Sequence, residues 1–166
     1  TATITVDANP IVANADNDNK VVTFSTAAQT VKKTDGTTLN VLANDKLGAT
    51  EGLNNTQVTI QTTHPVADIT IKANGEVEVG ANKAPGVYEL KYKIRETADP
   101  THVSAEATVK VVVKNKVELD AIPTTPANPS TDGRTPNTVV DILDNTKING
   151  NKPNANEVTI EVVTPA

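Results

Sequence analysis

Apolar and polar residues alternate along most of this chain, in short runs rich in Val, Ile and Thr. Such runs are typical of β-strands with one buried and one wet face. The clearest is Val87–Arg95, whose apolar residues share one face: Tyr88, Leu90, Tyr92 and Ile94. Strands are expected at ATITV (2–6), KVVTF (20–24), TLNVLA (38–43), QVTIQT (57–62), DITIK (68–72), EVEV (76–79), VYELKYKIR (87–95), EATVKVVV (106–113) and EVTIEVV (157–163).

One wet face and one dry face on each strand favour an antiparallel sandwich over a parallel sheet buried on both sides. The apolar stripe of Val87–Arg95 is expected to form the centre of its core, with alternate valines of the following strand: Val109, Val111 and Val113. Asn74-Gly75 predicts a hairpin with a type I′ turn. No helix longer than a turn or two is expected, and the polar stretch Lys46–Asn55 could hold a short helical turn.

The chain contains a repeated phrase. TLNVLANDKL at 38–47 returns as VVDILDNTKI at 139–148, and QVTIQTTHPV at 57–66 returns as EVTIEVVTPA at 157–166. The spacing is about a hundred residues, the length of one immunoglobulin-like sandwich. ATITV at 2–6 also resembles ATVKVVV at 107–113. These echoes predict residues 1–14 as the closing strand of a preceding repeat with its linker, 15–115 as a complete repeat, and 116–166 as a linker and the opening of another.

Two Pro- and Asn-rich segments, Asp7–Asn19 and Asp120–Asn137, are interpreted as linkers between repeats. The N-terminal strand and the C-terminal part each lack the rest of a domain on this interpretation. We therefore expect that they complete one another, within one chain or by strand exchange between copies. The alternative is that both ends are loosely held.

Composition narrows the function. Of 166 residues, 37% are hydrophobic and only three are aromatic, so the core must consist of aliphatic side chains. There is no cysteine, which excludes a disulfide framework and thiolate metal sites. The net charge of −5, with acids and bases interspersed, argues against nucleic acid as a partner. No apolar run is long enough to span a membrane.

The succession PIVANADN, LNVLAND, NGEVEV, APGVYELKYKIRETADPTH and ATVKVVV, over residues 10–113, resembles the Ig-like and cadherin-like tandem repeats of large bacterial surface adhesins of the Bacteroidetes type. The resemblance implies all-β, antiparallel Greek-key (Ig-like) β-sandwich repeats on a secreted, surface-anchored protein. The chain departs from that family twice. It lacks the Cys pair that many relatives carry near Arg95 and Val103, and VLANDKLGATEG replaces their acidic DxDGD calcium loop.

Calcium is one open possibility. Asp16-Asn17-Asp18-Asn19 superficially resembles a cadherin calcium junction, and Asp7, Glu96 and Asp99 could supply further oxygens if the fold brings them together. The alternative is a solvated linker, which we favour, so no metal ligand and no cofactor are assigned. A Lys–Asn isopeptide cross-link is a second open possibility, which linear order cannot test.

Catalysis has little support. His64 and His102 lie in polar turn contexts without a partner nearby in sequence, and are interpreted as surface residues. Glu76 with Glu78, and Glu89 with Glu96, are interpreted as a solvated sheet face balanced by lysines. No catalytic residue is assigned, and no enzyme activity is expected.

The preferred function is therefore a structural spacer or stalk, or an adhesion module, of a bacterial surface protein. Its expected partners are neighbouring repeats of the same chain and a host or cell-surface protein or glycan. The alternative is a carbohydrate- or protein-binding Ig-like domain that uses its loops. Exposure of Tyr88 and Tyr92 on one flat face would favour the alternative, because aromatic platforms bind sugars.

Overall fold

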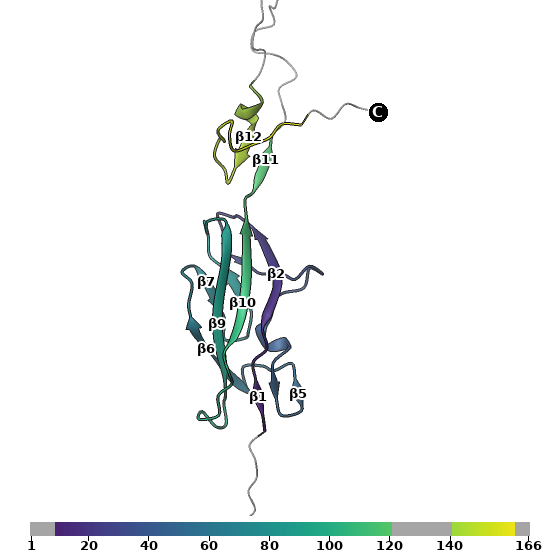
Figure 1. The fold of residues 1–166 in the computed structure, drawn as a ribbon, viewed down its shortest axis with the longest axis vertical. Helices are drawn as coiled ribbons and strands as arrows, with labels where there is room; N and C mark the ends of the chain where they lie inside the picture. Colours follow the sequence, from purple (N-terminus) through teal and green to yellow (C-terminus); the bar gives the residue numbers. More distant parts are fainter. Residues whose placement is uncertain (1–8, 121–140, 162–166) are drawn as a thin grey trace, which may run out of the picture. The chain divides into compact units, whose positions relative to one another are not determined.

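The computed structural model describes residues 9–120 and 141–161, apart from the side chains of residues 17–19. The chain divides into two compact units, the first ending at Lys114 and the second beginning at Asn115. The regular secondary structure of the described residues consists of β-strands and two short 3-10 helices (Figure 1). The all-β prediction is therefore confirmed. No described helix is long and apolar enough to cross a membrane.

The first unit contains three sheets. The largest has the strand order β2 (Asp16–Thr23), β10 (Ala107–Lys114), β9 (Gly86–Glu96) and β6 (Val58–His64). The second has the order β3 (Gln29–Thr30), β8 (Val77–Val79) and β7 (Ile69–Ile71). The third joins β1 (Ile11–Val12), β4 (Lys46–Leu47) and β5 (Thr50–Glu51), and the 3-10 helix η1 (Val41–Ala43) precedes β4.

The two larger sheets enclose one aliphatic core. The predicted stripe on β9 is confirmed, because Leu90, Tyr92 and Ile94 are fully buried and Tyr88 packs partly buried against them. Its predicted partners on β10 are buried as well: Val109, Val111 and Val113. Alternate residues of β7 and β8 supply the opposite side of the core. This arrangement is a β-sandwich, whereas the Greek-key connectivity stays a prediction.

One pairing differs from the antiparallel expectation. β2 runs parallel to β10, with Val22 level with Val113, while the other described pairings in this sheet are antiparallel. The register shifts between Asp16 and Lys20, so that three residues of β2 lie opposite a single residue of β10. Parallel pairing joins segments far apart in the chain, and strand patterning alone does not reveal it.

The predicted strand at residues 38–43 is wrong. Its first half forms only isolated bridges, and its second half is helical. Val41–Ala43 forms η1, because the Asn40 side chain accepts a hydrogen bond from the Leu42 amide (2.9 Å) and caps a turn. Val41 and Leu42 are both buried by that turn. Branched apolar residues indicated burial correctly, but burial does not distinguish a strand from a short helix.

The Asn74-Gly75 hairpin between β7 and β8 is confirmed, but its turn is not type I′. Only Gly75 has a positive φ, +90°, and the Lys72 amide donates to the Glu76 carbonyl (2.7 Å) across a three-residue loop. A glycine after a type I turn gives this geometry. Positive φ at two consecutive residues occurs instead at Asn149 (+53°) and Gly150 (+84°), where the chain turns after β12 (Thr146–Ile148).

Three further predictions need correction. Asp7–Asn19 is not simply a linker, since it supplies β1 and the start of β2. Lys46–Asn55 holds the β4–β5 hairpin rather than a helical turn. Residues 157–161 are not a strand, and no described strand lies beside them to pair with. The predicted strand at 2–6 and almost all of Asp120–Asn137 lie outside the described residues.

The second unit repeats local features of the first. Its β11 (Val117–Leu119) pairs with β12 as β1 pairs with β4, and the 3-10 helix η2 (Ile142–Asn145) precedes β12 as η1 precedes β4. Asp141 caps η2 through the Leu143 amide (2.9 Å), as Asn40 caps η1. Both repeated phrases thus fold into the same capped turn followed by a short strand.

Candidate functional site

The described residues contain one buried cluster of acidic and polar groups, in the first unit. Its members come from three segments: Asn14 and Asp16 from the start of the unit, Asp45 from the end of η1, and Tyr92 from β9. Tyr92 points into the core because it alternates with outward-facing Lys91 and Lys93. Asp45 follows the buried turn of η1 and is itself fully buried.

The Tyr92 hydroxyl is surrounded by acceptors. It lies 3.1 Å from the Asn14 carbonyl oxygen, 3.3 Å from the Val41 carbonyl oxygen, and 3.2 and 3.3 Å from the two Asp45 carboxylate oxygens. An Asp16 oxygen lies 3.5 Å away. One hydroxyl hydrogen can satisfy only one of these acceptors at a time. The cluster therefore has more acceptors than donors.

Further hydrogen bonds attach the N-terminal segment to η1. The Asn14 amide donates to an Asp45 carboxylate oxygen (2.7 Å), and the Asn14 side chain donates to the Asn44 carbonyl. The side-chain amide nitrogen of Asn44 donates to Asp16 (3.4 Å). The side-chain oxygen of Asn44 is buried and has no hydrogen-bond partner among the described residues. The cluster thus holds the connection between β1 and β2 against the sandwich.

Burial makes both acids hard to ionise. Desolvation, and then the nearby Asp45 carboxylate, raise the pKa of Asp16 to about 7, while the charges of Lys20 and Lys33 oppose the increase. Desolvation raises the pKa of Asp45 to about 6, and hydrogen bonds from Asn14 and Tyr92 oppose it. Near neutral pH the pair can therefore take up a proton, which would supply the missing donor.

Desolvation, and then the nearby carboxylates of Asp45 and Asp16, raise the pKa of Tyr92. The phenol accordingly stays protonated and acts as a donor. Lys20 is buried on β2 and contributes positive charge beside Asp16. In chemical terms this arrangement binds protons and fixes a chain segment.

Of the residues considered for calcium, Asp16 and Glu96 are not brought together. Asp16 is level with Leu90 on β9 through Val109, whereas Glu96 lies six residues further along that strand, about 20 Å away. Asp99 accepts hydrogen bonds from Thr101 within its own loop. Among the described residues no three His, Cys, Asp or Glu side chains converge as a metal site. Asp7 and the side chain of Asp18 lie outside the description.

The histidines differ from one another. His64 is exposed at the end of β6, as predicted, although its Nδ1 lies 3.7 Å from a Glu106 carboxylate oxygen. His102 has a closer partner, contrary to prediction, because its Nδ1 lies 2.7 Å from a Glu96 carboxylate oxygen in a half-buried position. This pair joins the two sides of the loop between β9 and β10. Glu96 and His102 are six residues apart in the chain, so the sequence alone does not show that they are in contact.

The aromatic platform expected for sugar binding is not formed by the tyrosines. Tyr92 is buried, and the ring of Tyr88 lies under the Lys83 ammonium, 4.4 Å from its centroid. The predicted balance of sheet-face carboxylates by lysines is found at Glu78, which lies 2.6 Å from Lys72.

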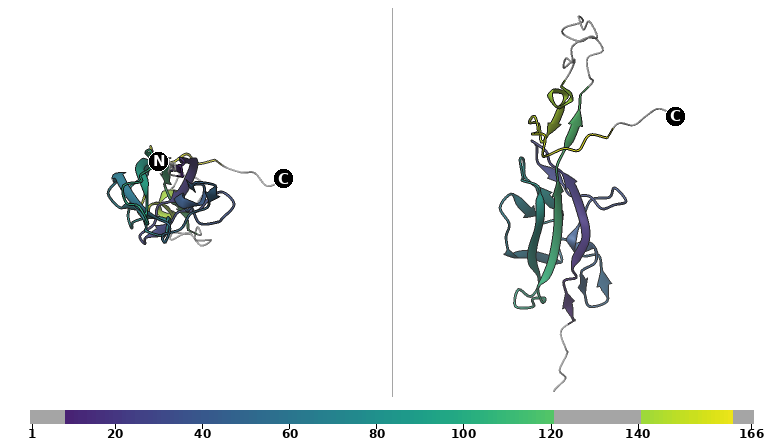
Figure 2. Two further views of the ribbon diagram at one scale, coloured as in Figure 1. Left: turned by 90° about the horizontal axis from the view of Figure 1, so that it is seen from below. Right: turned by 45° about the horizontal axis from the view of Figure 1, so that its top comes forward.

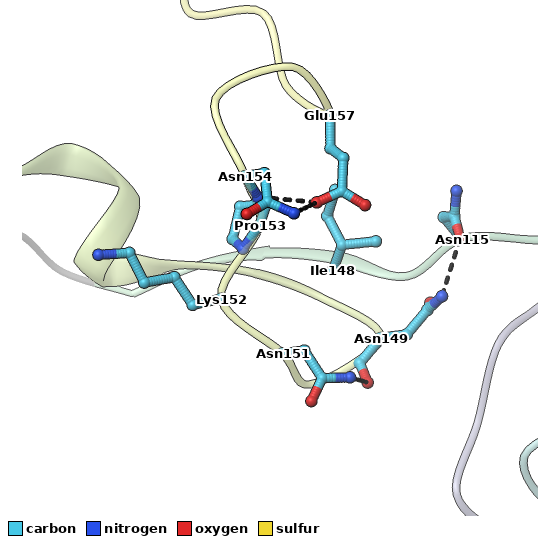
Figure 3. Close-up of a pocket in the computed structure, with 8 residues that line it drawn as sticks. All are labelled: Asn115, Ile148, Asn149, Asn151, Lys152, Pro153, Asn154 and Glu157. Carbon is cyan, nitrogen blue, oxygen red and sulfur yellow. Dashed lines mark hydrogen bonds between the residues drawn. The ribbon is translucent and has the colours of Figure 1, made fainter.

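A pocket of about 530 Å³ lies in the second unit, next to the Asn149-Gly150 turn (Figure 3). Asparagines dominate its lining, with Ile148 and Pro153 as apolar residues. Several amides bond to one another or to Glu157: Asn149 donates to Asn115 (2.8 Å), and Asn154 donates to Glu157 (3.1 Å). These bonds hold the loops of the unit in place.

Sequence reasoning missed the buried cluster as a unit. Tyr92 was expected only in the core, and Asp16 only as a candidate calcium ligand. Asp45 carried a signal, because it lies within the repeated phrase, three residues after the buried Leu42. The second copy has Thr146 there, also buried, with its hydroxyl bonded to the Ile142 carbonyl (3.1 Å).

Comparison with known proteins gives little. No family model and no curated protein matches the chain. One solved structure with some likeness is a SusE-like surface-located polysaccharide-binding protein of the heparin utilisation locus of Bacteroides thetaiotaomicron, at 14% identity and a TM-score of 0.36. The match covers 65% of this chain and 15% of that protein. Likeness at this level supports no statement about function.

Proposed function

We propose that this chain is a load-bearing, non-catalytic spacer module of a secreted bacterial surface protein, repeated in series along its parent chain. The observation that carries the proposal is the parallel pairing of β2 with β10. β10 is the last strand of the first unit, and β2 is its first long strand, directly after the two-residue strand β1. They form neighbouring members of its main sheet (Figures 1 and 2).

Parallel terminal strands respond to tension in a particular way. The chain enters near β1 at one end of the first unit and leaves through Lys114 at the other (Figure 1). Tension therefore pulls β2 and β10 in opposite directions along their common axis. The hydrogen bonds between them are loaded together in shear, including the bond from the Phe24 amide to the Lys114 carbonyl (2.7 Å). A spacer under load benefits from this geometry.

The second unit supports a serial arrangement. Its capped turn and the strand pair around it match those of the first unit, at the spacing of the repeated phrase. The next loop matches too: the Asn54 amide bonds to Gln57 (3.1 Å), and the Asn154 amide bonds to Glu157 (2.7 Å). We infer that the second unit is the beginning of another sandwich of the same kind.

Matched core substitutions test the mechanical role. Val22 is buried on the loaded strand β2, and Val77 is buried on β8 in the other sheet. Replacing either with Ala removes the same two methyl groups, and each change should lower the melting temperature. Pulling on the chain ends by atomic force microscopy should give a clear drop in unfolding force for Val22→Ala and a smaller one for Val77→Ala. Equal drops would refute a load-bearing β2–β10 pair.

The second candidate function is recognition of a partner on the cell surface. The observation that favours it is the concentration of positive charge on the outer face of the main sheet, in a chain of net charge −5. Cations gather there on β9 and β10.

A further inference from the structure

Positive charge is concentrated on one sheet face. Inward-facing residues of β9 and β10 are buried, so the residues between them face outward. The outward set has five cations and two carboxylates: Lys91, Lys93, Arg95, Lys110 and Lys114, with Glu89 and Glu106. The net charge of this set is +3. The net charge of the whole chain is −5, so the remaining residues together carry −8.

The cations form an elongated strip, which we call the basic strip. Lys91, Lys93 and Arg95 are alternate residues of β9 and span about 13 Å. Lys110 lies beside them on β10, opposite Glu89. Lys114 extends the strip one residue beyond Gly86, so its full length from Arg95 is about 30 Å. A strip of this shape fits an extended chain better than a small anion.

Part of this charge is not neutralised. Lys91 lies 3.4 Å from Glu106, and Arg95 bonds to the neutral Gln61 (3.3 Å). Within the part of the chain that the structure describes, no carboxylate lies at ion-pair distance from Lys93 or Lys110. The same holds for Lys114, which is exposed. These three ammonium groups can pair with an external anion without breaking an existing ion pair.

A row of valines crosses the same sheet face, between the cations of the basic strip. Val112 pairs with Val21 on one side and with Val87 on the other, so three valines cross the sheet side by side. Val87 is 63% exposed and Val21 is 41% exposed. A flat row of methyl groups can contact the C–H faces of sugar rings. Recognition of nucleic-acid bases depends instead on aromatic stacking, and this face has no aromatic residue.

We infer that the basic strip binds an acidic polysaccharide chain laid along β9 and β10. The carboxylates or sulfates pair with the free lysines, and the rings contact the valine row. The negative charge of the rest of the molecule disfavours the denser phosphate backbone of duplex nucleic acid. This inference rests on the second candidate function and is independent of the load-bearing role, which pulling experiments test separately.

The test compares two variants of the full chain. The strip variant carries Lys93→Gln, Lys110→Gln and Lys114→Gln. Binding is measured by microscale thermophoresis with dextran sulfate and polygalacturonate at low and moderate salt. We expect wild-type affinity for both polymers to fall as salt rises, because binding releases counterions. The strip variant should bind about tenfold more weakly.

The control variant removes the same charge elsewhere in the first unit, by Lys32→Gln, Lys46→Gln and Lys72→Gln. It should bind as tightly as wild type, and uncharged dextran should not bind. Equal weakening of both variants would overturn the inference, since it would mean that only net charge matters. Duplex DNA bound as tightly as the polysaccharides, or wild type that binds neither polymer, would also overturn it. Thermal unfolding of both variants confirms that each is folded.

Discussion

Replacing Asp45 with Asn tests the buried cluster, because asparagine has the same shape but cannot ionise. Burial raises the pKa of Asp45 from its ordinary 3.8 to about 6. Between these values the folded state binds more protons than the unfolded state. The stability that this group contributes is therefore complete below pH 3.8 and is lost as the pH rises through about 6. A salt-bridged carboxylate behaves in the opposite way.

The magnitude follows from the same values. The difference between 3.8 and about 6 corresponds to about 3 kcal/mol of destabilisation at pH 8. Asparagine offers one acceptor oxygen in place of two, which weakens the hydrogen bonding with Asn14 and Tyr92 and reduces the expected gain to about 1–2 kcal/mol. For a domain of about 100 residues this is about 5–10 °C in Tm. Asp45→Asn should therefore melt higher than wild type at pH 8.

Thermal unfolding at pH 5 and pH 8 measures the effect. Wild type should be more stable at pH 5, and Asp45→Asn should lose part of that difference, because Asp16, whose pKa is also raised, still titrates in this range. Asp35→Asn is the control, because hydrogen bonds from Thr37 lower the pKa of exposed Asp35 and move its titration below this pH range. Wild type that is equally or more stable at pH 8 would refute the reasoning. So would an Asp45→Asn variant that keeps the full pH difference.

Three other predictions concern the core, a turn and calcium. Leu90→Ala should cost about 2–5 kcal/mol in urea unfolding because the side chain is fully buried, whereas exposed Val87→Ala should cost less than about 0.5 kcal/mol; equal costs would defeat the core assignment. Gly75→Ala should lower Tm more than Gly36→Ala: both glycines have positive φ, but only at Gly75 would a Cβ overlap a side chain, that of Asn40. Adding calcium or chelator should leave Tm unchanged, since Asp16 and Glu96 lie far apart on the sheet; a shift of several degrees would contradict this.

The parts of the fold that sequence predicts well are those that depend on local alternation. Leu90, Tyr92 and Ile94 share a face because their spacing is two, and the structure buries all three. The Asn74-Gly75 hairpin follows from glycine's tolerance of positive φ, although the exact turn depends on how the flanking strands pair. Such features need only neighbouring residues.

The parts that were missed depend on distant residues. The contact of Asp45 with Tyr92 joins positions 47 residues apart, and Asn14 with Tyr92 spans 78. The parallel β2–β10 pair likewise joins the two ends of the first unit. Amphipathic patterning contains no information on which strand ends meet. The repeated phrase at Asp45 and Thr146 was the one local signal near the cluster.

The direction of pulling tests the central claim most directly. The chain has no cysteine, so pairs of introduced cysteines can serve as handles. Handles at Asn9 and Asn115 load β2 against β10 in shear. Handles at Thr26 and Asn115 attach instead near the ends of β2 and β10 that lie side by side, and peel the strands apart one hydrogen bond at a time. The account predicts a several-fold higher unfolding force in shear; equal forces in the two directions would contradict a load-bearing role.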